Sequence, residues 1–135
     1  MRFLLDTNVV SEVSKKRPVA KVLNFLQAHE AVCVIPSIVL AERYQGARTA
    51  PVEKRDELLE IVQQFHQEFS DRILPFDAKA AEVWGEYTGR KEMRQQPKSY
   101  PDTQIAAIAL ANNLTVVTRN TADFPGVPTI NPFED

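Results

Sequence analysis

The chain has 135 residues, of which 44% are hydrophobic and 25% are charged, a composition typical of one folded domain spanning residues 1–135. No apolar run reaches the roughly 20 residues that a membrane span requires, and Asp6 interrupts the N-terminal apolar stretch before a signal-peptide core could form. We therefore expect a cytoplasmic protein that does not associate with a membrane. A single cysteine, Cys33, excludes an internal disulfide and a cysteine-rich zinc site.

In the first half of the chain, short apolar runs typical of buried strands alternate with apolar residues at helical spacing. The pattern predicts a strand at residues 3–5, a helix from Pro18, a strand at 31–35, a helix capped by Ser37 that stops at Gly46, and a helix from Pro51 to about Ser70. Residues 6–8 are expected to form a loop directly after the first strand.

The second half continues the alternation. It predicts an edge strand at 73–76 broken by Pro75, a helix capped by Asp77, a polar loop at 95–100, an apolar helix from Pro101, a strand at 114–118 and a last edge strand at 129–130. Strands that alternate with helices form a parallel sheet covered by helices on both faces. The sequence therefore predicts an α/β fold.

Four acids are expected at one end of this sheet, where α/β folds form their binding crevices. Asp6 follows the first strand, Asp123 follows the strand at 114–118, Asp102 lies at a helix entrance, and Glu42 continues the apolar side of its helix. Helix caps and turns would explain Asp6, Asp102 or Asp123 singly. Their convergence favours a site for Mg²⁺, with Mn²⁺ as a substitute, because ligands that are all oxygen select hard cations.

Other hydrolytic chemistries lack their usual residues. His29 and His66 are expected to be solvated surface side chains, which argues against histidine acid–base catalysis. The sequence contains neither a glycine-rich phosphate loop nor a glycine-flanked serine nucleophile. Hydrolysis of a phosphodiester by metal-activated water is the chemistry that remains.

The formal net charge of −2 is unusual for a protein that binds nucleic acid. Setting the four acids aside as metal ligands would make the remaining charge positive, with basic residues gathered at 15–17 and at Arg90, Lys91, Arg94 and Lys98. Two interpretations stay open for these basic segments, which could bind phosphate or form an ordinary solvated face.

Six motifs occur along the chain in a fixed order. They are Leu4 to Glu12, Ser37 to Gly46 around Glu42, Ile73-Leu74-Pro75-Phe76-Asp77, Asp102-Thr103-Gln104-Ile105-Ala106-Ala107, Thr118-Arg119-Asn120-Thr121-Ala122-Asp123-Phe124 and Asn131-Pro132-Phe133. In this order and spacing, the motifs make the chain resemble the PIN-domain toxins of the VapC type, particularly the FitB-like branch. The resemblance covers nearly the whole length.

The resemblance implies a parallel sheet of five strands with helices on both faces and an acidic pocket for one or two divalent ions. By motif, Asp6, Glu42 and Asp102 match the invariant acidic positions of the family, while Asn120 and Asp123 share a more variable fourth position. The ligand set and catalytic set expected here is Asp6, Glu42, Asp102 and Asp123, and the residues expected to orient it are Thr7, Asn8, Thr118 and Asn120.

The resemblance also implies a function, which is that of a magnesium-dependent endoribonuclease, the toxin of a type II toxin–antitoxin pair. Its expected partners are RNA as the substrate, a cognate antitoxin, a second copy of the chain in a homodimer, and DNA only through the antitoxin. One alternative is a non-catalytic half of a DNA-bound repressor complex. Another is a metal-dependent phosphatase or DNA nuclease built on a similar sheet.

Overall fold

The computed structural model describes residues 1–134, and in this part of the chain five strands form one sheet with the order β3-β2-β1-β4-β5. All four pairings are parallel, as predicted. The strands are β1 (Phe3–Leu5), β2 (Cys33–Pro36), β3 (Ile73–Leu74), β4 (Thr115–Val117) and β5 (Thr129–Ile130). β1 and β2 are buried along their whole length, which agrees with their uninterrupted apolar sequences.

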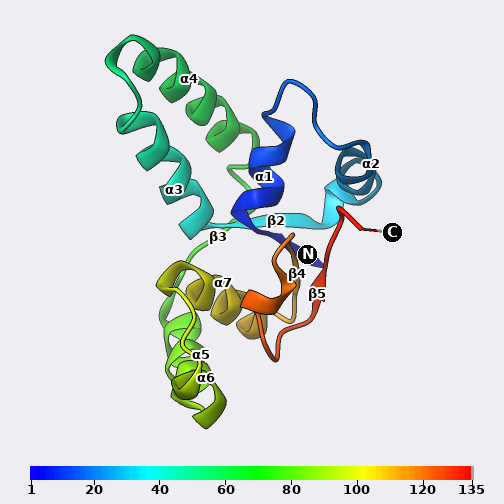
Figure 1. Cartoon of the computed structure of the whole chain (residues 1–135), viewed down its shortest axis with the longest axis vertical. Coiled ribbons are helices and arrows are strands. Elements are labelled where there is room, and N and C mark those ends of the chain that lie inside the picture. Colours follow the sequence, from blue (N-terminus) through cyan, green and yellow to red (C-terminus); the bar gives the residue numbers. More distant parts are fainter. Residues whose placement is uncertain (135) are drawn as a thin grey trace.

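Helices connect these strands and cover both faces of the sheet. They are α1 (Thr7–Val13), α2 (Ala20–His29), α3 (Ser37–Arg48), α4 (Val52–Glu68), α5 (Ala78–Gly89), α6 (Lys91–Gln95) and α7 (Tyr100–Ala111). Figure 1 shows α1, α3 and α4 on one side of the sheet and α5, α6 and α7 on the other. Within residues 1–134, no helix combines the length and the apolar character needed to cross a membrane.

Helix α7 occupies the centre of one layer. Its residues from Ile105 to Ala109 are all buried, because one side of the helix faces the sheet and another packs on α5. The helix ends at Ala111, and Asn113 then adopts a left-handed conformation with φ of 54° that lets the chain turn into β4. The burial of α7 fixes the position of its first turn relative to the strands.

The order of the strands creates a crevice at one end of the sheet. From β1 the chain moves outward to β2 and β3, and then crosses to the opposite side of β1 to form β4 and β5. Connections leave β1 and β4 in opposite directions, and such a switch point opens a crevice beyond the carboxyl ends of the two strands. Asp6 and Thr118 immediately follow these ends.

Two predicted boundaries were wrong for identifiable reasons. Residues 6–8 are not a loop, because the Asp6 carboxylate accepts a hydrogen bond from the Thr7 backbone N–H and starts α1 at once. Gly46 does not stop α3, which continues to Arg48. A glycine inside a helix costs only about 1 kcal/mol relative to alanine, and packing of α3 against α4 supports the last turn.

Smaller differences concern caps and one short helix. Ser37 is the first residue of α3 and Pro36 occupies the cap position, whereas Asp77 caps α5 as predicted by accepting a hydrogen bond from the Ala80 N–H at 2.9 Å. Helix α6 was not predicted, because only Met93 of its five residues is buried and its sequence shows no periodic apolar pattern.

Candidate active site

Asp6 is held rigidly at the switch point between β1 and β4. Its backbone N–H donates to the Val117 carbonyl at 3.0 Å, which extends the pairing of the two strands by one residue. Its carboxylate accepts hydrogen bonds from the Thr7 N–H at 2.8 Å, the Thr118 hydroxyl at 2.8 Å and the Asn8 side-chain amide at 3.3 Å. Three donors therefore fix the orientation of a carboxylate that is only 6% exposed.

The environment of Asp6 opposes its ionisation. Burial raises the pKa of the carboxyl above its usual value, and the hydrogen bonds from Thr118 and Thr7 lower it in part. The negative charges of Asp102 and Glu42 raise the pKa further, which places both side chains within electrostatic range of Asp6. The structure thus brings three of the predicted acids to one region.

Glu42 reaches this region from α3. Its Oε1 accepts a hydrogen bond from the Thr7 hydroxyl at 2.9 Å, so α1 and α3 are joined beside Asp6. Glu42 is half-buried and lines a pocket of about 390 Å³ between α1, α3 and α4. The structure therefore places Glu42 next to the residue that follows Asp6, and its role as a metal ligand stays a prediction.

Asp102 lies in the first turn of α7. Its backbone N–H donates to the Ser99 hydroxyl at 3.3 Å, so Ser99 caps the helix. Burial raises the pKa of the Asp102 carboxyl, the Ser99 hydroxyl lowers it, the charge of Asp123 raises it and the charge of Lys98 lowers it. Ser99 was not identified from the sequence, although serine three residues before an acid is a recognised cap signature.

Asp123 and Asn120 follow β4 and differ in their surroundings. Asp123 is half-exposed at the end of the short helix η2 (Thr121–Asp123), and its charge acts on Asp102. Asn120 is exposed, and its backbone N–H donates to the Thr118 hydroxyl oxygen at 3.0 Å. Its side chain forms no hydrogen bond with another residue in 1–134, so Asn120 acts on the region through its backbone.

A second buried acid shows how a purely structural carboxylate differs from Asp6. Glu12 is 2% exposed, but its carboxylate forms an ion pair with Lys15 at 2.9 Å and accepts a hydrogen bond from the Val19 N–H at 2.9 Å. The bond to Lys15 is the main reason that the pKa of Glu12 is lowered. Asp6, in contrast, has no ion pair within residues 1–134 and faces two further acids.

The atoms near Asp6 that could coordinate a metal ion suit a hard divalent cation. Within residues 1–134 they are carboxylate and hydroxyl oxygens, with no histidine or cysteine among them, and Mg²⁺ and Mn²⁺ prefer oxygen ligands. In residues 1–134 no three acidic, histidine or cysteine side chains are close enough to enclose an ion in their present positions. Glu42 and Asp102 would therefore have to move toward Asp6 on binding.

Both histidines were expected to be solvated, and this was wrong. His66 on α4 is half-buried, and its Nδ1 lies 2.8 Å from the Tyr44 hydroxyl of α3. His29 is half-buried and packs its ring against Phe3 and Phe25. Tyr44 of the neighbouring helix α3 covers His66, and Phe3 of strand β1 covers His29, so both positions look like outer faces only when a helix is considered alone. Neither histidine contacts any of the four acids in residues 1–134, so histidine catalysis gains no support.

Relatives of this chain are similar over nearly their whole length. A plasmid stability protein, StbB, from Pseudomonas syringae is 36% identical, with 97% of this chain and 98% of the relative covered. The VapC ribonuclease Y4jK of Sinorhizobium fredii is 30% identical, with 97% of each chain covered. The toxin FitB of Neisseria gonorrhoeae is 31% identical, with 98% of this chain and 99% of the relative covered.

Solved structures and a family description agree with these relatives. The structure of FitAcB from Neisseria gonorrhoeae matches with a TM-score of 0.88 at 31% identity and covers 98% of this chain and 99% of that chain. A toxin–antitoxin complex from Klebsiella pneumoniae matches with a TM-score of 0.68 at 26% identity, covering 98% of each chain. Residues 3–128 match the family described as PIN domain. The chain therefore belongs to the PIN-domain family.

Proposed function

We propose that this protein is a metal-dependent endoribonuclease and the toxin of a toxin–antitoxin pair. The observation that carries the proposal is Asp6, a buried carboxylate at the switch point of the sheet that is fixed by three donors and flanked by Glu42 and Asp102. Such a group is costly to keep ionised without a cation. Similarity to a protein named as a ribonuclease and to one named as a toxin supports the same function.

In this proposal, Asp6, Glu42 and Asp102 hold Mg²⁺, for which Mn²⁺ can substitute, and Asp123 completes the set. The cation supplies Lewis-acid chemistry that activates water and neutralises charge on the phosphate. The hydroxyl of Thr118 and the amide of Asn8 fix the Asp6 carboxylate, since both donate to its Oδ2. Such orienting partners typically contribute 10- to 100-fold in metal affinity or activity.

Thr7 has a separate role in the proposed site. Its hydroxyl donates to Glu42 and its N–H donates to Asp6, so one residue links a carboxylate at the end of β1 to a carboxylate on α3. The alternative of a non-catalytic binding protein is less favoured. In a site that no longer binds a metal ion, a cationic side chain would be expected to neutralise Asp6, and none does so in residues 1–134.

The proposal is tested by incubating the purified protein with structured RNA, with DNA of the same sequence and with a phosphate monoester, each in Mg²⁺. We expect cleavage of the RNA alone. Cleavage of DNA at a similar rate would indicate a general nuclease, and release of phosphate from the monoester would indicate a phosphatase. Inactivity on all three substrates would favour the non-catalytic alternative. A Thr7→Val variant, which loses the hydrogen bond to Glu42, should retain substrate choice and lose rate.

We also propose that a small antitoxin inhibits this protein by inserting a basic side chain among Asp6, Glu42 and Asp102, and that any contact with DNA is made through the antitoxin. Arginine suits this position because its guanidinium binds carboxylates in a forked geometry. The toxin and antitoxin would act together in the cytoplasm. In the purified complex, Mg²⁺ binding should be blocked. This mode of inhibition would be contradicted if the inhibited complex bound Mg²⁺ with the same affinity as the free protein does.

A further inference from the structure

An aromatic pair, one half-buried ring and one exposed ring, lies beside the acidic region, next to Asp102. Trp84 of α5 and Tyr100, the first residue of α7, have ring centroids 5.3 Å apart with planes inclined by 46°. Tyr100 is 60% exposed, an unusual degree for a large aromatic side chain that packs on a second ring. Nothing in the proposed mechanism uses either ring.

Hydrogen bonds fix this pair relative to Asp102. The indole N–H of Trp84 donates to the Thr103 hydroxyl oxygen at 2.9 Å, and the Thr103 hydroxyl donates to the Tyr100 carbonyl at 3.0 Å. Thr103 is 5% exposed and directly follows Asp102 on the central helix α7. The first turn of α7, which carries the predicted metal ligand Asp102, therefore also positions the two rings.

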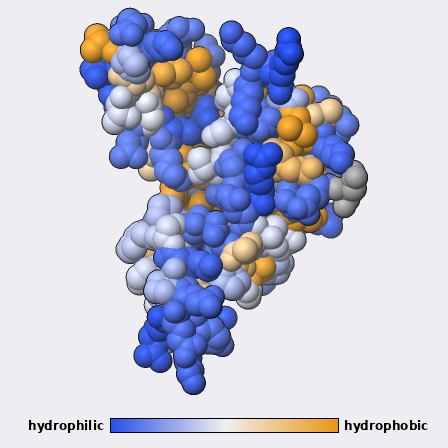
Figure 2. Space-filling model, in the orientation of Figure 1, coloured by the Kyte–Doolittle hydropathy of each residue, from blue (hydrophilic) through white to orange (hydrophobic). Residues whose placement is uncertain are grey.

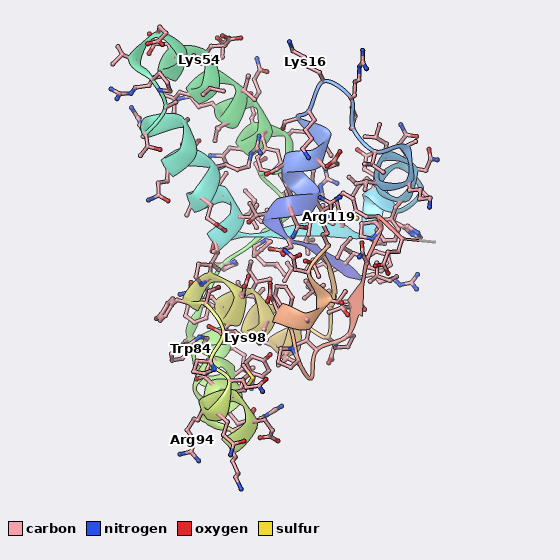
Figure 3. All side chains as sticks on the ribbon, viewed as in Figure 1. Lys16, Lys54, Trp84, Arg94, Lys98 and Arg119 are labelled. Carbon is pink, nitrogen blue, oxygen red and sulfur yellow. The ribbon has the colours of Figure 1, made fainter. Side chains whose placement is uncertain are left out.

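The rings border a basic pocket. Trp84, Tyr100, Arg94 and Lys98 are among the residues that line a pocket of about 370 Å³ between α5, α6 and the start of α7. Neither Arg94 nor Lys98 forms a salt bridge with a residue in 1–134, and Lys98 is near enough for its charge to act on Asp102. Figure 3 shows Lys98 and Trp84 close together, with Arg94 farther away on α6.

The surface around this pocket is hydrophilic, which matters for the kind of ligand. Figure 2 shows strongly hydrophilic residues over α6, in contrast to the apolar patches near α3 and α4. An exposed aromatic ring beside two cations that form no salt bridge within residues 1–134 suits a ligand that carries both flat rings and negative charge. Single-stranded nucleic acid has both, and its binding sites combine aromatic stacking with basic side chains along the backbone.

We propose that Tyr100, supported by Trp84, stacks an unpaired base of the RNA substrate while Lys98 and Arg94 bind the adjoining phosphates. This inference rests on the proposed ribonuclease function, and it adds a subsite that binds a nucleotide near the proposed metal site of Asp6, Glu42 and Asp102. A base within a duplex has its faces covered by its neighbours, so the subsite selects RNA that is unpaired at this nucleotide. Specificity for loops or single strands follows.

Trp84 is the single tryptophan of the chain, so its fluorescence reports on this subsite directly. The binding experiment uses the cleavage-deficient Asp6→Asn protein in Mg²⁺, titrated with a 12-nucleotide single-stranded RNA. Binding should quench Trp84. Tyr100→Ala should raise Kd by about 5- to 150-fold, the range typical of one base stacked on an aromatic ring. The matched variant Tyr100→Phe, which keeps the ring, should leave Kd unchanged.

A scan with abasic nucleotides separates stacking from any general effect of the substitution on folding. Removing the base at one position of the RNA should weaken binding to the protein that retains Tyr100. The same removal should have little further effect on the Tyr100→Ala protein, because the two changes delete the same interaction. Lys98→Gln should lower the dependence of log Kd on log salt concentration by about 0.7, the value for one contact to single-stranded phosphate.

The outcomes distinguish this inference from the proposed function. Cleavage of RNA without quenching of Trp84, together with an abasic scan that shows no sensitive position, would overturn the subsite and leave the ribonuclease proposal intact. The subsite would also be wrong if Tyr100→Ala changed only the oligomeric state, because the surface would then bind protein. A chain that neither binds nor cleaves RNA would overturn both proposals.

Discussion

Replacing Asp6 by asparagine should separate the cost of its charge from its role in holding a cation. Without divalent ions, the raised pKa of Asp6 means that the folded protein binds its proton more tightly than the unfolded chain does. The free energy of unfolding therefore falls as pH rises from the unfolded pKa through the raised folded value. Asp6→Asn removes this loss and can keep the cap on Thr7 through its side-chain oxygen. In EDTA at pH 7, it should be at least as stable as the wild type.

Addition of Mg²⁺ should reverse this order. At a concentration 100 times Kd, a bound ion stabilises the fold by about 2.7 kcal/mol. With an unfolding entropy of about 2.1 cal/mol/K per residue, a chain of 135 residues should then gain about 10 °C in Tm. Asp6→Asn loses the central ligand and should gain far less. The assay is thermal unfolding by circular dichroism with Mg²⁺ and with EDTA.

Glu12→Gln is the matched control, because it neutralises a buried acid outside the acidic region. Losing the ion pair with Lys15 should lower Tm equally in Mg²⁺ and in EDTA, while the gain on adding Mg²⁺ stays that of the wild type. A Tm gain on adding Mg²⁺ as large in Asp6→Asn as in the wild type would refute the role of Asp6 as a metal ligand. An Asp6→Asn protein that is unfolded in EDTA would also refute it, since the carboxylate would then be structural.

Two further predictions concern other single residues. Asp123→Asn should weaken Mg²⁺ affinity and RNA cleavage more than Asn120→Ala, because the charge of Asp123 reaches Asp102 whereas Asn120 acts through its backbone. If a metal titration shows that Asp123→Asn leaves Mg²⁺ affinity unchanged, Asp123 is a turn residue and not a metal ligand. Burial raises the pKa of Cys33 to about 11, so the native thiol should resist alkylation at pH 8 and stability should fall as pH rises from about 9 toward 11. Rapid labelling of the native protein would contradict this.

Much of the fold could be predicted because β1, β2 and most of β4 are buried. The apolar runs of β1, β2 and β4 stand out from the helical spacing around them, and the observed strands lie within two residues of the predicted ones. Helix α1 could not be recognised from the sequence, because its start depends on whether the Asp6 carboxylate accepts a hydrogen bond from the Thr7 N–H. In the folded chain the Asp6 N–H also donates to the Val117 carbonyl of β4, a contact between residues distant in the sequence.

The acidic region was predictable in part. Asp6 could be placed at the sheet end from its position after an apolar run, and Asp102 from its position at a helix entrance. The pairing of Thr7 with Glu42 and the packing of Trp84 on Tyr100 were not predictable, because each joins helices whose relative positions only the folded chain defines. No spacing rule within one helix contains this information.

The most direct test of the account is RNA cleavage by the purified wild type and by Asp102→Asn, in Mg²⁺ and in EDTA, with the product ends identified. Hydrolysis by activated water predicts 5′-phosphate and 3′-hydroxyl ends, activity that requires the divalent ion, and loss of cleavage in a folded Asp102→Asn protein. Products that carry 2′,3′-cyclic phosphate, or full activity in excess EDTA, would contradict the account.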